Sequence, residues 1–188
     1  ERFGNRQITD LTVMVRDFVA PKRPDPNHPA VLDPQAQANF MRDMLAAVRQ
    51  YRSIVAMAPT GSGKSTVALN TAAELGRSTL ILVHLEQLLD QWIQEIKAKL
   101  GLPETEIGII QSDRCDYDKP ICVGMLHSLA QRTYPREAYR SFGLVVVDEV
   151  HKIGTAAFSQ VVTQFPSFYR IGLSATPHRR DGGHRVIF

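Results

Sequence analysis

The stretch Ala58-Pro-Thr-Gly-Ser-Gly-Lys-Ser65 decides the fold, because it lies between an apolar run, Ser53–Met57, and a helix-like segment, Lys64–Leu75. Its two glycines allow the backbone to curl so that amide groups point at one centre. The N-terminus of the following helix adds a dipole that favours anions. Strand, glycine-rich loop and helix in this order are the context of a phosphate-binding loop (P-loop). The sequence therefore predicts a P-loop, although Ala58 replaces the first glycine of the general pattern.

A P-loop predicts that the chain binds ATP together with Mg²⁺. Lys64 is expected to reach the β- and γ-phosphates, and the Ser65 hydroxyl is expected to ligate Mg²⁺. The other residues expected to contact the nucleotide are Thr60, Gly61, Ser62, Gly63 and Thr66.

A pair of acids follows the apolar run Leu144–Val147, in the stretch Asp148-Glu-Val-His151. A carboxylate at the carboxyl end of a buried strand points into the site crevice of an open α/β sheet. Asp148 is therefore expected to hold Mg²⁺ through water, and Glu149 is expected to orient and deprotonate the attacking water. Without the P-loop, the two acids would be interpreted as helix caps.

The stretch Ser174-Ala-Thr176 follows a further predicted strand, Tyr169–Leu173. Alone it has little meaning, since serine and threonine commonly begin a turn before a proline such as Pro177. Its value lies in its position after the P-loop and the acidic pair.

Between residues 31 and 188, helical and strand-like segments alternate, and the strands are apolar on both faces. This pattern predicts an α/β domain with three layers and a mainly parallel central sheet. The predicted strands are 53–57, 79–84, 107–110, 121–125, 144–147 and 169–173, and the predicted helices are 35–48, 64–75, 85–100 and 155–162. Residues 1–30 stand apart, as a strand-like segment, Ile8–Phe18, and a proline-rich linker.

The composition is that of a globular protein, with 44% hydrophobic and 22% charged residues among 188. The net charge of +3 permits a nucleic-acid partner without indicating one. The apolar runs are too short to span a bilayer, and Cys115 and Cys122 are expected to be free thiols. We expect a cytoplasmic or nucleoid-associated protein with no membrane partner. The start, Glu1-Arg-Phe-Gly, is interpreted as the edge of a larger protein.

Together these motifs resemble superfamily 2 helicases and translocases: the P-loop with alanine first is similar to motif I, Asp148-Glu-Val-His151 to motif II and Ser174-Ala-Thr176 to motif III. Finer matches resemble the branch that contains type III restriction subunits, excision-repair helicases and phage branch-migration helicases. These matches are Leu82-Val-His84 with Leu88-Leu-Asp-Gln-Trp92, Val123-Gly-Met-Leu-His-Ser-Leu129, and the stretch 172–182 around motif III. The resemblance covers about residues 31–188.

The resemblance implies the first RecA-like domain of a DNA helicase or translocase, which needs a second RecA-like domain with an arginine finger for turnover. It implies that His84, Gly124 and His127 contact nucleic acid, and that His151, Ser174 and Thr176 couple the nucleotide to movement. Adenine would be recognised by Gln35, with Gln37 as the alternative. Leu85 and Met125 depart from the family pattern in the segments that contact nucleic acid.

Several alternatives stay open at the level of sequence. The chain could be a small-molecule kinase, a non-hydrolysing interaction module, a restriction-system subunit or an RNA helicase. Trp92 lies in an apolar helical stripe, which favours a place in the core over base stacking. Arg179 and Arg180 are rivals to an arginine finger from a second domain.

Overall fold

The computed structural model describes residues 34–58, 61–152 and 156–175. The predicted strand at 8–18 and the proline-rich segment after it lie outside these residues. So do Thr60, Thr176, Arg179 and Arg180.

One mixed sheet forms the centre of the described part of the chain. Its strands are β1 (Ser53–Met57), β2 (Thr79–Val83), β3 (Ile107–Gln111), β4 (Arg114–Cys115), β5 (Ile121–Met125), β6 (Leu144–Val147) and β7 (Tyr169–Ser174). Their order is β1-β7-β6-β2-β5-β3-β4. Every pairing is parallel except that of β4 with β3. The predicted mainly parallel sheet is confirmed.

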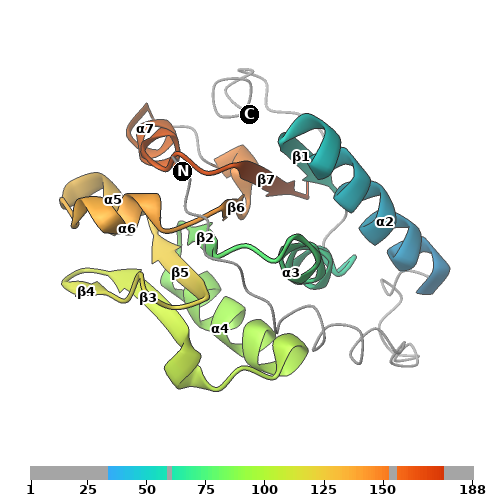
Figure 1. Ribbon diagram of the computed structural model, residues 1–188, viewed down its shortest axis with the longest axis horizontal. Helices are drawn as coiled ribbons and strands as arrows, with labels where there is room; N and C mark the ends of the chain where they lie inside the picture. The colour runs from blue at the N-terminus through green and yellow to red at the C-terminus, as the bar shows by residue number, and fades with distance from the viewer. Residues whose placement is uncertain (1–33, 59–60, 153–155, 176–188) are drawn as a thin grey trace.

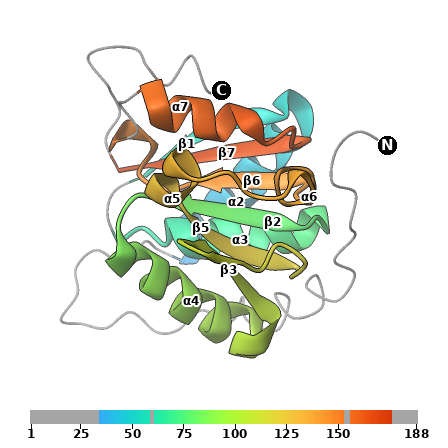
Figure 2. The same cartoon turned by 90° about the vertical axis from the view of Figure 1, so that its left-hand side faces the viewer.

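Helices cover both faces of the sheet, as Figures 1 and 2 show. They are α2 (Pro34–Tyr51), α3 (Lys64–Leu75), α4 (Glu86–Leu100), α5 (Leu126–Gln131), α6 (Arg136–Arg140) and α7 (Ala156–Gln164), with short 3₁₀ turns at Glu104–Glu106 and Val150–Lys152. Buried side chains of α2, α3 and α4 form one core cluster with the sheet, and those of α5, α6 and α7 form the other. The predicted three-layer α/β architecture is confirmed.

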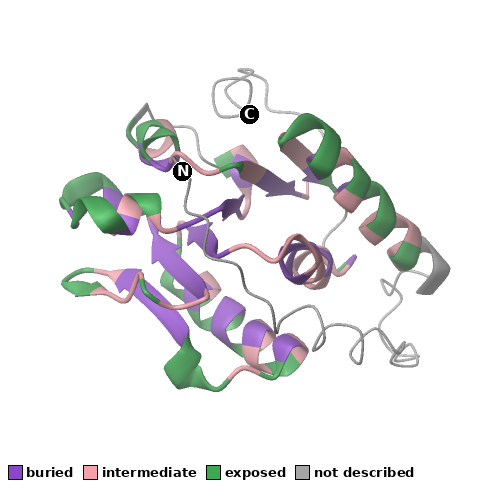
Figure 3. Cartoon of the chain, viewed as in Figure 1, coloured by how far each residue is buried: buried purple, intermediate pink, exposed green. Residues whose placement is uncertain are grey.

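The sheet interior is apolar because its central strands are covered on both faces. All five residues of β2 are buried, and so are all of β5 and β6. Figure 3 shows this contrast between buried strands and the exposed outer faces of the helices. The helix α3 ends where expected, because Gly76 takes a left-handed conformation (φ 59°) and its N–H bonds to the carbonyls of Ala72 and Ala73.

Besides the two 3₁₀ turns, three elements were not predicted. The strand β4 has two residues, and α5 and α6 have six and five. Segments this short contain less than two helical turns, so periodicity cannot reveal them. The other elements agree with prediction to within a few residues, and α2 and α7 run further than expected.

The carboxyl ends of the parallel strands lie at one edge of the sheet, which is where open α/β sheets bind ligands. The P-loop follows β1, His84 follows β2, α5 follows β5 and Asp148 follows β6. The sequence motifs therefore meet at one edge. None of the described helices is long and apolar enough to cross a membrane.

Candidate active site

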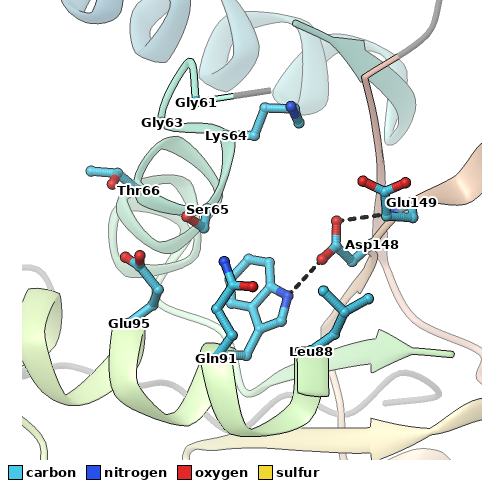
Figure 4. Close-up of a pocket in the computed structure, with 11 residues that line it drawn as sticks. Gly61, Gly63, Lys64, Ser65, Thr66, Leu88, Gln91, Glu95, Asp148 and Glu149 are labelled. Carbon is cyan, nitrogen blue, oxygen red and sulfur yellow. Dashed lines mark hydrogen bonds between the residues drawn. The ribbon is translucent and has the colours of Figure 1, made fainter. Parts of the chain in front are cut away.

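A cavity of about 410 Å³ opens at this edge of the sheet. Three elements line it: the P-loop with the start of α3, the turn after β6, and one side of α4 (Figure 4). The lining residues are Gly61, Gly63, Lys64, Ser65, Thr66, Leu88, Gln91, Trp92, Glu95, Asp148 and Glu149. The cavity thus brings together the P-loop and the acidic pair, which lie far apart in the sequence.

The P-loop has the conformation that its glycines permit. Gly61 and Gly63 have φ values of 80° and 76°, which side-chain-bearing residues rarely adopt. A Cβ at Gly63 would also collide with the amide nitrogen of Gln37. The buried Ser62 hydroxyl has no hydrogen-bond partner among the described residues.

The Lys64 ammonium lies over the P-loop, where its Nζ donates a hydrogen bond to the Ala58 carbonyl at 2.8 Å. Burial lowers the pKa of Lys64, and the negative charges of Glu149 and Asp148 oppose that shift. These opposing effects follow from the geometry in Figure 4, in which Lys64 and Ser65 lie across the cavity from the two acids.

The Asp148 carboxylate is fixed at both oxygens. Its Oδ2 accepts a hydrogen bond from Trp92 Nε1 at 2.8 Å, and its Oδ1 accepts one from the Glu149 backbone N–H at 2.8 Å. Burial raises the pKa of Asp148, against the effect of these two hydrogen bonds. A nearby cation stabilises the charged form of a desolvated carboxylate of this kind.

Glu149, His151 and Ser174 form a chain of contacts. Glu149 Oε2 lies 3.1 Å from His151 Nε2, and His151 Nδ1 lies 3.0 Å from Ser174 Oγ. A carboxylate only accepts, so Nε2 carries the proton, and in the neutral ring Nδ1 accepts from the Ser174 hydroxyl. Lys152 Nζ also lies 3.4 Å from Glu149 Oε2, and Glu149 has a left-handed φ of 51°.

This chain of contacts links the second motif to the start of the third. Ser174 is buried at the carboxyl end of β7, which lies between β1 and β6 in the sheet. The predicted coupling residue Thr176 lies outside the described residues. The geometry therefore provides a physical route for the coupling role predicted for His151 and Ser174, which stays a prediction.

The side chains that line the cavity fit a nucleoside triphosphate bound together with Mg²⁺. Ser65 and Asp148 supply oxygen atoms, which Mg²⁺ prefers, and Lys64 supplies a cation beside a helix N-terminus. Of the residues predicted for phosphate and metal, Gly61, Gly63, Lys64, Ser65, Thr66, Asp148 and Glu149 line this one cavity. Ser62 is buried and is not among the lining residues, and Thr60 lies outside the described residues.

The two candidate adenine-recognition residues differ in position. Both belong to the first turns of α2, but the structure places only the backbone of Gln35. The Gln37 side chain lies against the P-loop at Gly63. Recognition of adenine by Gln35, or by Gln37 as the alternative, stays a prediction.

The residues predicted to contact nucleic acid lie in different environments. His84 follows β2 and is half-buried, and burial together with Lys152 lowers its pKa, so it is neutral at pH 7. His127 is exposed on α5, with its ring 4.8 Å from that of Phe158. Gly124 is buried within β5.

The glycine at position 124 has a packing reason. A Cβ there would lie 3.2 Å from Leu80 Cδ1, 3.3 Å from Leu82 Cδ2 and 3.4 Å from Leu129 Cδ1. Its backbone is also paired on both sides, with β2 and β3. Met125, one of the departures from the family pattern, is likewise buried, whereas Leu85 is 46% exposed.

Sequence reasoning missed the contribution of α4 to the cavity. Gln91 and Glu95 line it, and Glu95 Oε2 is buried without a hydrogen-bond partner among the described residues. Trp92 is in the core as expected (3% exposed), but its indole N–H reaches Asp148. The signal was present: a buried tryptophan needs an acceptor for its N–H, and the apolar stripe offers none.

Comparison with known proteins places this site in a family. Residues 32–179 match the family described as type III restriction enzyme, res subunit. The chain is 36% identical over 141 residues to the DNA 3'-5' translocase XPB2 of Sulfurisphaera tokodaii, covering 75% of this chain and 30% of that protein. It is 31% identical over 140 residues to the DNA 3'-5' helicase XPB of Mycobacterium tuberculosis, covering 71% and 25%. The chain thus spans less than a third of these relatives.

Solved structures share the fold at lower identity. A hypothetical ATP-dependent RNA helicase from Sulfolobus tokodaii superposes with a TM-score of 0.67 at 16% identity, covering 93% of this chain and 53% of that one. The UvsW helicase from bacteriophage T4 superposes with a TM-score of 0.60 at 21% identity, covering 79% and 55%. The chain therefore belongs to the type III restriction enzyme res subunit family, as a RecA-like ATPase motor domain of the superfamily 2 helicase type.

Proposed function

We propose that this domain drives a DNA helicase or translocase, in which ATP hydrolysis moves the protein along DNA. One observation carries the proposal: Lys64 and Ser65 face Asp148 and Glu149 across a single cavity, and Glu149 continues through His151 to Ser174. Such a motor needs groups that bind phosphate, a carboxylate that binds the metal, a base, and contacts that connect the site to the rest of the domain. The XPB proteins among the relatives support DNA as the track.

Each residue has a distinct task in this mechanism. Lys64 and the P-loop amides bind the phosphates. Ser65 and Asp148 would hold Mg²⁺, which when bound would neutralise charge on the transferred phosphoryl group. Glu149 orients the attacking water and accepts its proton. The His151 Nε2–H donates to the Glu149 carboxylate at 3.1 Å, and this contact holds the base in place. A change at Glu149 on hydrolysis therefore reaches Ser174 in β7.

The nucleic-acid surface of the proposed motor lies at the same edge of the sheet. His127 is the exposed member of the predicted set, and the neutral His84 would contribute a hydrogen bond rather than a charge. Contacts of this kind with the nucleic-acid backbone carry no sequence information. We therefore expect weak binding that tolerates any sequence and weakens as salt rises.

We further propose that turnover requires a second RecA-like domain. The chain spans only 25–30% of the two XPB relatives, which leaves room in such proteins for another domain. An arginine finger supplied across the cleft is worth roughly 10³–10⁵ in rate. The 188-residue chain alone is then expected to have almost no DNA-stimulated ATPase.

The test is steady-state ATPase of the 188-residue chain and of a longer protein that includes the second domain, each with single-stranded DNA, duplex DNA and RNA. The proposal expects DNA-stimulated turnover only in the longer protein, and its loss in Lys64→Ala. Stimulation by RNA alone would favour an RNA helicase, and turnover indifferent to every nucleic acid would contradict a motor. If the 188-residue chain matches the longer protein, the two-domain proposal is wrong, and Arg179 and Arg180 become the candidate fingers.

A further inference from the structure

The hydrogen bond between Trp92 and Asp148 is the long-range anchor of the metal-binding carboxylate. Among the described residues, the second hydrogen bond to this carboxylate comes from the next residue, Glu149, whereas Trp92 is 56 positions away, on α4 (dashed lines in Figure 4). A local contact moves with Asp148 itself. The contact from α4 instead ties the carboxylate to a separate rigid element.

The element that carries Trp92 is well anchored. The helix α4 has 15 residues, and five of them, Trp92 included, are buried against the sheet. The indole ring is 3% exposed and belongs to the core cluster formed with α2 and α3. Its N–H therefore has a fixed position, at hydrogen-bond distance from a charged acceptor, where such bonds are strongest.

We propose that Trp92 is a positioning residue for the metal: its indole N–H sets the orientation of the Asp148 carboxylate, and α4 thereby determines the Mg²⁺ affinity of the nucleotide site. The inference rests on the proposed role of Asp148 as a Mg²⁺ carboxylate. With Oδ2 held by Trp92 and Oδ1 held by the Glu149 N–H, the remaining lone pairs of the carboxylate are restricted to few directions. A carboxylate held from one side only would sample more orientations, and metal binding would have to select among them.

The magnitude follows from what is known of residues that support metal ligands. Loss of a group that hydrogen-bonds a ligand typically costs 10–100-fold in metal affinity or activity. The Mg²⁺ concentration for half-saturation is therefore expected to rise about tenfold when the indole N–H is removed.

The variant Trp92→Phe tests this, because it keeps an aromatic ring in the core and removes the N–H. Binding of a fluorescent ADP analogue is measured across a Mg²⁺ series and in EDTA. We expect the half-saturating Mg²⁺ concentration to rise about tenfold, while the affinity without Mg²⁺ stays at the wild-type value. A Trp92→Phe protein with the Mg²⁺ dependence of the wild type would overturn the inference.

The matched control is Ile93→Val, on the same helix. Ile93 is buried (6% exposed) in the same core cluster, and it does not line the cavity. The Ile93→Val variant should have a slightly lower thermal midpoint and an unchanged Mg²⁺ dependence of nucleotide binding. An equal shift in both variants would mean that general loosening of α4, and not the hydrogen bond, affects the metal, and the inference would fail.

A second readout uses the fact that Trp92 is the only tryptophan of the 188 residues. Its emission should change when Mg²⁺ is added to the chain with unlabelled ADP, at the Mg²⁺ concentrations that drive analogue binding. Tryptophan emission that does not change with Mg²⁺ concentration would contradict the inference.

The variant Asp148→Asn separates this inference from the assignment of the metal. It should abolish both the emission change and the Mg²⁺ dependence. If it keeps the Mg²⁺ dependence, then the metal assignment itself fails and the inference fails with it. If it loses that dependence while Trp92→Phe behaves as wild type, only the role of Trp92 is wrong.

Discussion

The nucleotide cavity and the β5–α5 segment (residues 121–131) lie at the same edge of the sheet, but they are built differently. In the cavity, the polar side chains are linked: Trp92 to Asp148, and Glu149 to His151 and on to Ser174. In the β5–α5 segment, Gly124 is buried by apolar neighbours, and the exposed His127 packs against Phe158. The cavity gathers charged and hydrogen-bonded side chains, whereas the β5–α5 segment places one exposed histidine beside buried apolar residues.

The largest expected effect is that of Glu149→Gln, at the centre of the linked region. Turnover should fall by roughly 10²–10⁴-fold, the contribution of a general base, while nucleotide binding is retained because Asp148 still holds the metal. Titration with a fluorescent ATP analogue measures the binding, and steady-state assays measure the turnover. Simultaneous loss of binding would show that Glu149 is structural.

A smaller effect is expected for Ser174→Ala, at the outer end of the same chain of contacts. It removes the hydroxyl that lies 3.0 Å from His151 Nδ1, a hydrogen bond worth about 1 kcal/mol. The stimulation of the ATPase by DNA should fall roughly fivefold, and more than the basal rate does. Thr163→Ala, which removes an exposed hydroxyl on α7, is the control. Equal losses in the basal and the DNA-stimulated ATPase rates would show that Ser174 has no role in coupling.

In the β5–α5 segment, substitutions at the two predicted contact residues, Gly124 and His127, should have opposite effects on stability and on DNA binding. Gly124→Ala must shift methyl groups of Leu80 and Leu82 by a few tenths of an ångström, so it should destabilise the protein by about 1 kcal/mol and lower the thermal midpoint by about 2–4 °C. His127→Ala should leave the midpoint unchanged and weaken DNA binding. Thermal unfolding measures the midpoint of both variants, and anisotropy with unrelated oligonucleotides measures their DNA binding. An unchanged midpoint in Gly124→Ala would show that Gly124 is not needed for packing and would favour its predicted role as a contact residue.

The smallest effect concerns pH and Asp148. Burial raises the pKa of Asp148 in the folded protein, so between the two pKa values the folded state binds more protons than the unfolded state. The contribution of this group to stability therefore falls as pH rises. In EDTA, the thermal midpoint of the wild type relative to Asp148→Asn should increase as pH is lowered from neutral toward the ordinary range of an aspartate. A difference that shrinks on acidification would mean that the carboxylate is better solvated than its burial implies.

Much of the cavity could be predicted because a P-loop and an acid pair are local patterns with a fixed relation to the sheet. Lys64, Ser65, Asp148 and Glu149 each follow or begin a predictable element, and parallel strands bring their carboxyl ends to one edge. The contribution of α4 could not be predicted in this way. Gln91, Trp92 and Glu95 face the cavity only because the helix packs at a particular angle and rotation on the sheet.

The same limit applies to the β5–α5 segment. The family resemblance implies a nucleic-acid contact for Gly124, and the structure places this residue between two paired strands, so the contact stays a prediction. An alternating or continuous apolar run predicts a strand, but whether a glycine within it faces solvent or a leucine depends on the neighbouring elements. The short elements β4, α5 and α6 escaped prediction because they exist through tertiary packing and not through propensity.

The sequence by itself determined the α/β class, the P-loop and the groups that we propose handle phosphate, metal and water. These follow from backbone conformations that only certain residues adopt and from side chains that only certain ligands require. The tertiary structure alone decided that Trp92 supports Asp148, that His151 joins Glu149 to Ser174, and that Gly124 is a packing residue. These relations join residues distant along the chain, and a hydrogen bond a few ångströms long exists only after the sheet and its covering helices have fixed both partners.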